Sequence, residues 1–153
     1  FNKVFLLSHI YNHLFHEGIG LRQLLDYYYV LQNDVEFSND YNVLFSHLGI
    51  RNIAGAIMWI LTEYFGMKQD KVLVPVDESR GRFVLNEILQ GGNFGKYDTR
   101  YMFGNGKFGR NLQRLYRDWR LLRYFPSQAI SEPIFRFWHF LWRQKHKTGK
   151  VNK

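Results

Sequence analysis

The chain has 153 residues, the length of about one domain, and 46% are hydrophobic against 22% charged, which excludes an intrinsically disordered chain. It contains no cysteine, which excludes disulfides and thiol catalysis and favours a reducing, cytoplasmic compartment. The net charge of +8 is unevenly placed, because the stretch 106–153 holds 12 Lys and Arg against 2 Asp and Glu. The basic excess is therefore a local feature of the last third.

Apolar residues recur at helical spacing through the first half of the chain. They predict helices over 1–15, 21–33, from Ser38 or Asn39 to about Leu48, and over 53–65. On the second of these we expect Leu21, Leu24, Leu25, Tyr28 and Leu31 to share one face. The segment 53–65 is apolar nearly all round, which predicts a central buried helix.

The second half contains one strand-like stretch, 71–76, and Pro75 restricts it to an edge strand or an extended connector. Six of the 13 glycines lie between 91 and 109 and predict the longest loop. Further helices are expected from Asp77 or Ser79 to Leu89, over 108–124, and from Glu132–Pro133 to about His146. Together these elements predict an all-α bundle of about seven helices with a long Gly-rich loop, forming a single domain over residues 1–153.

Three histidines, His9, His13 and His16, follow one another at i, i+4 and i+7 on one face of the first helix. A pair at i and i+4 can grip a metal ion, and the metalloprotease signature adds a Glu directly after the first His. Ile10 occupies that place, so the general base is missing. We therefore expect a polar helix face here and no structural metal site.

The string from Gly18 to Asp26 reads as a sharp turn followed by the start of a helix. Arg22 and Asp26 are four residues apart and can form an ion pair. The free N–H groups of the helix start lie beside the Arg22 guanidinium, which suits an anion such as a phosphate. The alternative is an ordinary helix hairpin.

The predicted helix 108–124 places Arg110, Arg114 and Arg117 in register on one side, and the string FRFWHFLWRQKHK follows at 135–147. This combination suits phosphates or an anionic membrane surface, and the alternative is a solvated charged face. We expect weak, salt-sensitive binding to polyanions. The aromatic residues of the last helix are expected to lie mostly in the core: Phe135, Trp138, Phe140 and Trp142.

The strings HIYNHLFHEGIGLRQLLDYYYVL and EILQGGNFGKYD resemble an uncharacterised bacterial nucleotidyltransferase family of the Bacteroidetes type. The matching positions are His9, His13, Gly18, Gly20, Leu21, Arg22, Gln23, Asp26, Gly92, Asn93, Phe94 and Gly95. In that family the catalytic part is an α/β domain of the polymerase-β type, with a Gly-Ser turn and metal-binding aspartates, and it lies upstream of the matched region. The resemblance implies that this chain is the helical C-terminal portion of a longer protein.

The resemblance also implies how the parts would act. The upstream domain would hold Mg²⁺ and carry out catalysis, and this segment would not be catalytic alone. His9 and His13 would line the cleft for a nucleotide and an unknown acceptor, with Arg22 aimed at a phosphate and Asp26 beside it. Two alternatives stay open. One is a non-enzymatic module that uses the basic last third on anionic lipid or another polyanion, peripheral to the inner membrane. The other is a stand-alone metal- or nucleic-acid-binding helical protein.

Overall fold

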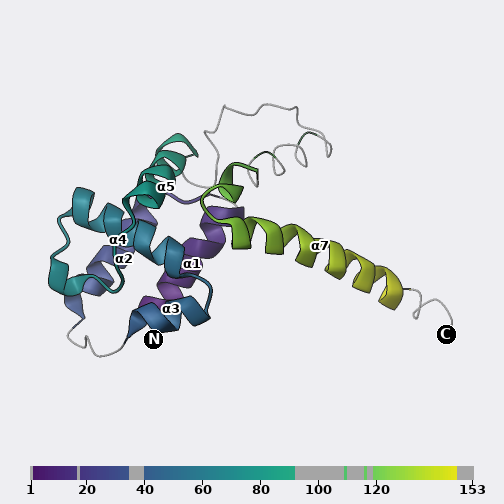
Figure 1. Cartoon of the computed structure of the whole chain (residues 1–153), viewed down its shortest axis with the longest axis horizontal. Coiled ribbons are helices and arrows are strands. Elements are labelled where there is room, and N and C mark those ends of the chain that lie inside the picture. The colour runs from purple at the N-terminus through teal and green to yellow at the C-terminus, as the bar shows by residue number, and fades with distance from the viewer. Residues whose placement is uncertain are drawn as a thin grey trace. The chain divides into compact units, whose positions relative to one another are not determined.

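A computed structural model describes residues 2–16, 18–34, 40–91, 109, 116 and 119–147 of the chain (Figure 1). The chain divides into two compact units, residues 1–100 and 101–153, and each is described by itself. The first unit contains α1 (Asn2–His16), α2 (Leu21–Asn33), α3 (Tyr41–His47), α4 (Arg51–Phe65), the short 3-10 helix η1 (Gln69–Lys71) and α5 (Glu78–Gly91). The second contains α7 (Pro126–Lys147). The described residues include no strand, and the predicted all-α class is confirmed.

The core of the first unit forms around α4, as its apolar sequence predicts. Every residue from Ile53 to Leu61 is buried, and α2, α3 and α5 pack around this helix (Figure 1). Gly66 ends α4 with a φ of 69°, a left-handed conformation that glycine adopts without steric cost. The strand-like stretch 71–76 begins on the last residue of η1 and is otherwise the extended connector that leads to α5, one of the two predicted possibilities.

Aspartates cap two of the helices. The Asp40 carboxylate accepts a hydrogen bond of 3.2 Å from the Val43 N–H at the start of α3. The expected caps Ser38 and Asn39 lie outside the described residues, and the structure assigns the cap to Asp40. Asp77 caps α5 as predicted, because its Oδ1 accepts from the Arg80 N–H at 3.0 Å.

The buried face of α2 differs from the predicted one. Leu24, Tyr27 and Leu31 are buried, whereas Leu21 and Leu25 are exposed. The spacing of three and four residues places Leu24, Tyr27 and Leu31 on one line of the helix. A run of nearly continuous apolar and tyrosine side chains offers several such lines, and packing against α1 and α4 selects this one.

Asp34 joins three parts of the first unit, through a buried cation on one side and a second lysine on the other. The Lys3 side chain of α1 is 4% exposed and its Nζ lies 2.8 Å from Asp34 Oδ2, just after α2. The Lys71 Nζ donates to the Asp34 backbone carbonyl at 2.6 Å. Burial by itself lowers the pKa of Lys3, but hydrogen bonds to Asp34 and Tyr41 outweigh it and hold the pKa above its ordinary value.

Two helix-interior glycines set how closely the chain packs on α4. A Cβ at Gly55 would meet the Pro75 carbonyl oxygen at 2.9 Å, and one at Gly81 of α5 would press into the Trp59 ring. The Asp77 N–H donates to the Gly55 carbonyl at 3.0 Å, which fixes the connector on α4. Glycine inside a helix is unfavourable, so close approach is the physical reason for these two.

The last helix begins six residues before its predicted start at Glu132–Pro133. Phe125 is buried and not helical, and α7 starts at Pro126 and not at Pro133. Proline fits the first turn because its missing N–H has no partner there anyway. Pro126 provides that signal first, and the helix continues through Pro133. Within the described part of the chain, no helix combines the length and the apolar character that crossing a membrane requires.

Candidate functional site

The His9 and His13 side chains meet on the outer face of α1. Their ring centroids are 4.3 Å apart with planes 76° apart, an edge-on contact. Phe5 stacks on the other side of His9 at 6.3 Å, and both Phe5 and His9 are exposed. The structure therefore brings the two predicted histidines together, while the side chain of His16 lies outside the described residues.

A metal centre needs more than this pair. Among the described residues, no group of three or more His, Cys, Asp and Glu is arranged to hold a metal ion. What the His9–His13 pair can do chemically is donate and accept hydrogen bonds at a surface, since each neutral imidazole has one donor and one acceptor nitrogen.

The turn between α1 and α2 accounts for most of the Gly-Ile-Gly-Leu-Arg-Gln string. Gly18 has a φ of 92° and donates its N–H to the His13 carbonyl at 2.7 Å. Ile19 is buried, and the Gly20 N–H donates to Gln23 Oε1 at 3.0 Å. These four residues therefore have a structural explanation: they reverse the chain and satisfy the start of α2.

Arg22 of this string, and Asp26 four residues after it, are charged residues that the turn does not use. Both side chains are exposed on the outer face of α2, opposite the buried Leu24 line. In the part of the chain that the structure describes, they form no ion pair with each other. The Arg22 guanidinium, in the first turn of α2, is therefore presented to solvent.

The apolar neighbours of Arg22 and Asp26 on α2 are also exposed. Leu21, Leu25 and Tyr29 follow at intervals of four along the same outer face. An outer face that combines apolar side chains with an Arg and an Asp is suited to contact with another domain or ligand, because it offers both area and charge.

A hollow of about 280 Å³ lies where α4 begins and the connector enters α5. Sequence reasoning missed it, and the signal that could have found it is the interior glycine Gly55. The walls of the hollow carry both signs of charge, but the charged groups are engaged at short range: Arg51 with Asn42 at 2.6 Å, Asp77 with Arg80 at 2.5 Å and Glu78 with Arg82 at 2.8 Å. The contact of Arg51 with Asn42 joins α4 to α3, whereas the other two stay within α5 and the residue that caps it.

The predicted anion patch of Arg110, Arg114 and Arg117 lies outside the described residues, as does most of the predicted loop 91–109. Gly91, the first residue of that loop, closes α5. Of the neighbouring cations, Arg120 is half-buried, and burial lowers its pKa. The Arg123 guanidinium lies over the Tyr124 ring at 5.9 Å.

The expectation that the aromatic residues of the last helix lie in the core is wrong. The four residues expected there are all exposed: Phe135, Trp138, Phe140 and Trp142. Helical spacing shows which side chains share a face, but it does not supply a surface for that face to pack against. This exposed aromatic helix is the site feature that sequence reasoning assigned to the wrong environment.

Comparison with protein-family models, curated proteins and solved structures finds no match for the chain. The resemblance to a nucleotidyltransferase family stays a prediction that rests on the quoted residues.

Proposed function

We propose that this chain is the helical accessory domain of a nucleotidyltransferase. In this proposal it helps to shape the cleft for a nucleotide and its acceptor, and an upstream domain of the same protein holds Mg²⁺ and carries out the transfer. The observation that carries the proposal is that only some residues of the Gly-Ile-Gly-Leu-Arg-Gln string are needed for the turn. Gly18, Gly20 and Gln23 build the turn, whereas the Arg22 side chain takes no part in it.

The position of Arg22 suits recognition of a phosphate. A guanidinium offers several N–H donors in a planar fork that matches phosphate oxygens, and the start of a helix adds a favourable field for negative charge. The neighbouring Asp26 carboxylate can accept a hydrogen bond from a sugar or base.

The His9–His13 pair supports the same role on α1. Two imidazoles in edge contact, one exposed and one half-buried, offer hydrogen-bonding groups on a helix that the turn joins directly to α2. Nucleotidyl transfer depends chiefly on positioning and on neutralising phosphate charge. A helical domain that supplies an Arg and two His can contribute to both without providing the metal-binding carboxylates.

Isothermal titration of the complete gene product with each nucleoside triphosphate in the presence of Mg²⁺ tests this proposal. At least one triphosphate is expected to bind, and Arg22→Gln should weaken its binding about tenfold, the effect of losing one charge-assisted hydrogen-bonding group. The matched control is Lys68→Gln, which removes the same charge from an exposed position just after α4. It should leave the affinity unchanged.

Two results would contradict the proposal. The first is that no triphosphate binds the complete gene product. The second is that Arg22→Gln and Lys68→Gln bind equally well, since Arg22 would then contribute only general charge.

A further inference from the structure

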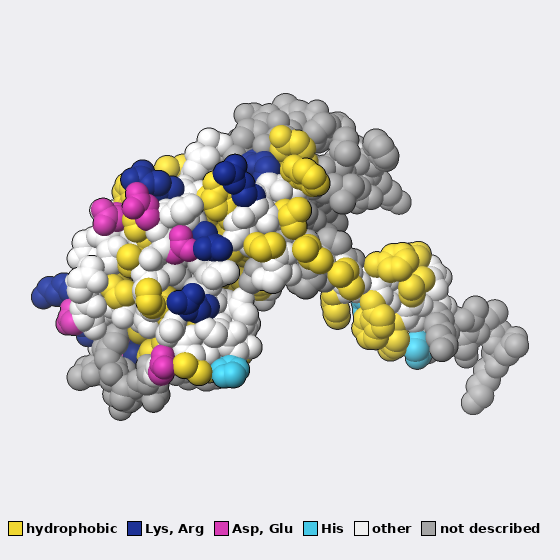
Figure 2. Space-filling view, viewed as in Figure 1, with side chains coloured by type: hydrophobic (Ala, Val, Ile, Leu, Met, Phe, Trp, Pro, Cys, Tyr) yellow, Lys and Arg dark blue, Asp and Glu magenta, His cyan; other side chains and the backbone are white. Residues whose placement is uncertain are grey.

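The described part of α7 carries its large apolar side chains at the surface. Eight of them are 45–66% exposed: Ile130, Ile134, Phe135, Phe137, Trp138, Phe140, Leu141 and Trp142. Figure 2 shows hydrophobic side chains gathered along this helix. Soluble proteins rarely expose so continuous an apolar surface unless it contacts a partner or a membrane.

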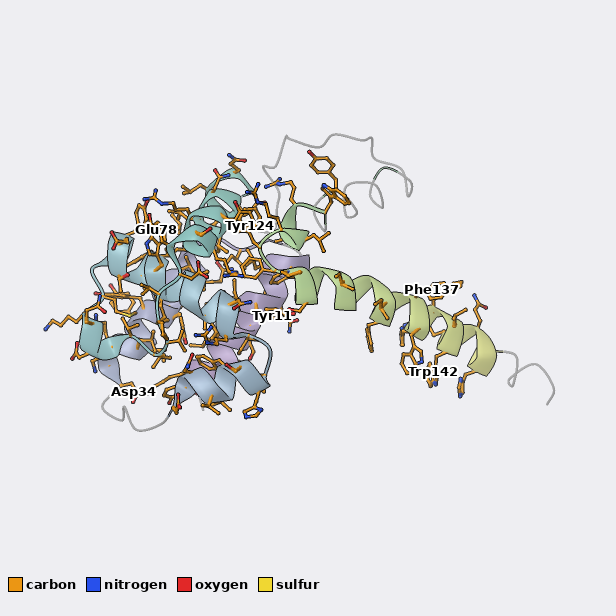
Figure 3. All side chains as sticks on the ribbon, in the orientation of Figure 1. Tyr11, Asp34, Glu78, Tyr124, Phe137 and Trp142 are labelled. Carbon is orange, nitrogen blue, oxygen red and sulfur yellow. The ribbon has the colours of Figure 1, made fainter. Side chains whose placement is uncertain are left out.

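The helix is nevertheless two-faced. At 100° per residue the eight residues occupy an arc wider than half of the circumference, which we call the apolar arc. Phe137 and Trp142 emerge on different sides of α7 in Figure 3, as an arc of this width requires. His139, Arg143 and His146 follow at intervals of four and three along the remaining side. The sequence of α7 holds four Lys and Arg against one Glu.

Aromatic rings line the boundary between the two sides. His139 stacks between Phe135 and Trp142, with ring centroids 6.0 and 5.9 Å away and nearly parallel planes. Trp142 continues the row onto His146 at 4.3 Å. Tryptophan and other rings with one apolar and one polar side favour the level of the lipid headgroups.

Length excludes a transmembrane orientation for this arc. Residues 130–142 span roughly 20 Å as an α-helix, well short of the roughly 30 Å hydrocarbon core of a bilayer. An amphipathic helix of this composition, with cations on its polar side, instead lies in the plane of the membrane surface.

Charge selects among the surfaces that could cover the apolar arc. The stretch 106–153 holds 12 Lys and Arg against 2 Asp and Glu, so a second copy would bring the same positive excess and repel it. A nucleic acid would satisfy the charge but leave the apolar arc in water. We propose that α7 binds an anionic lipid surface, with the apolar arc at the boundary between headgroups and acyl chains. This proposal does not depend on the nucleotidyltransferase proposal.

Flotation of the full chain with lipid vesicles tests the proposal. We expect binding to vesicles of phosphatidylcholine mixed with phosphatidylglycerol, much weaker binding to phosphatidylcholine alone, and a fall between low and physiological salt as the screening length shortens from roughly 30 to roughly 8 Å. Arg143→Gln should weaken binding about fivefold, the contribution of one cation near an anionic surface.

A pair of leucine variants, one inside the apolar arc and one outside it, tests whether membrane binding depends on the arc itself or on any exposed leucine. Leu141→Ser should weaken binding about tenfold or more, because the variant loses the transfer of one leucine side chain from water into the membrane. Leu89→Ser removes a leucine of α5 that is 62% exposed, against 50% for Leu141, and should bind like the unchanged protein. Tryptophan fluorescence should be quenched by brominated lipids, and the double variant Trp138→Phe/Trp142→Phe should lose this quenching.

Several outcomes would overturn the proposal. They are no binding to anionic vesicles at low salt, equal binding to neutral vesicles, and equal binding by Leu141→Ser and Leu89→Ser. Self-association in solution that Leu141→Ser abolishes, without vesicle binding, would assign the apolar arc to a second copy. Retention by an acidic protein without vesicle binding would assign it to a protein partner.

Discussion

Helices α4 and α7 are both rich in large apolar residues, yet they occupy opposite environments. Residues Ile53–Leu61 of α4 are buried without exception, whereas the apolar arc of α7 is exposed along its length. The difference lies in how polar residues interrupt the pattern. No charged residue occurs between Arg51 and Glu63, whereas Arg and His recur within the aromatic run of α7.

The comparison shows that the number of apolar residues in a helix decides how much of its surface must be removed from water. The positions of its polar residues decide which kind of surface can pack against it. A helix that is apolar all round can be enclosed only by other helices. A helix with a cationic strip must leave that strip in water, so its apolar side suits a flat surface such as a bilayer. Four predictions test or sharpen this contrast in stability.

The largest expected effect comes from truncating one isoleucine in each helix. Ile57 of α4 is 0% exposed and Ile134 of α7 is 62% exposed. Ile57→Ala should lower the free energy of unfolding by about 2–5 kcal/mol, because it removes buried methyl groups and leaves a cavity. Ile134→Ala should change it by less than about 0.5 kcal/mol. Urea unfolding followed by circular dichroism measures both, and equal losses would remove the contrast.

A buried and an exposed cation provide the next comparison. Asp34→Asn leaves the Lys3 charge without its carboxylate and should cost about 2–3 kcal/mol at neutral pH, whereas Arg143→Gln should have little effect. The pKa of Lys3 in the folded protein is raised above the ordinary value of 10.5. The contribution of this ion pair to the free energy of unfolding is therefore complete below pH 10.5. It is lost as the pH rises through the pKa of Lys3 in the folded protein. Unfolding curves at neutral and strongly alkaline pH check this sign. An unchanged difference between wild type and Asp34→Asn across that range would contradict it.

Close packing on α4 predicts a smaller loss. Gly81→Ala would place a methyl group 2.8 Å from Trp59 Cδ2, and forcing the ring or α5 to move should cost about 1–3 kcal/mol. Gly91→Ala at the end of the same helix meets no atom within 4 Å and is the control. Thermal melting of both variants measures the difference. If the two variants melt together, the contact between Gly81 and Trp59 does not limit the packing of α5.

The smallest expected effect is an increase in the free energy of unfolding, on removal of one buried hydroxyl. The Tyr27 hydroxyl is buried and has no hydrogen-bond partner among the described residues. Tyr27→Phe should therefore stabilise the protein by about 1 kcal/mol at neutral pH. Burial raises the pKa of Tyr27 far above 10.0, so stability falls as pH rises past the unfolded value, and the variant should lose this slope. A destabilised Tyr27→Phe protein in urea unfolding would indicate that the hydroxyl is satisfied.

Much of the helical pattern could be predicted from the sequence because the signals are local. The bounds of α2 follow from the glycine turn and from apolar spacing, and they match residue for residue. The burial of α4 follows from its composition. The buried line of α2 was missed because other residues of the helix are equally apolar. Leu24, Tyr27 and Leu31 are buried only because α1 and α4 pack against that side of the helix.

The candidate site was less predictable for the same reason. The spacing of His9 and His13 predicted that they share a face, and their rings do meet. Spacing could not show that Gln23 turns back to Gly20, which separates the structural residues of the string from Arg22. Nor could it show that α7 remains uncovered, since exposure depends on which surfaces lie beside a helix.

The hydrogen bond from the Asp77 N–H to the Gly55 carbonyl has a consequence for amide exchange with solvent. It joins residues far apart in the sequence, from the connector into the middle of a buried helix. The Asp77 proton can therefore exchange only when the connector separates from α4. If α5 opens before the rest of the first unit, the Asp77 amide will exchange with solvent at the same rate as the amides of α5. That rate will be faster than the exchange rate of the amides within α4. One amide thus reports whether the first unit unfolds in one step or in two.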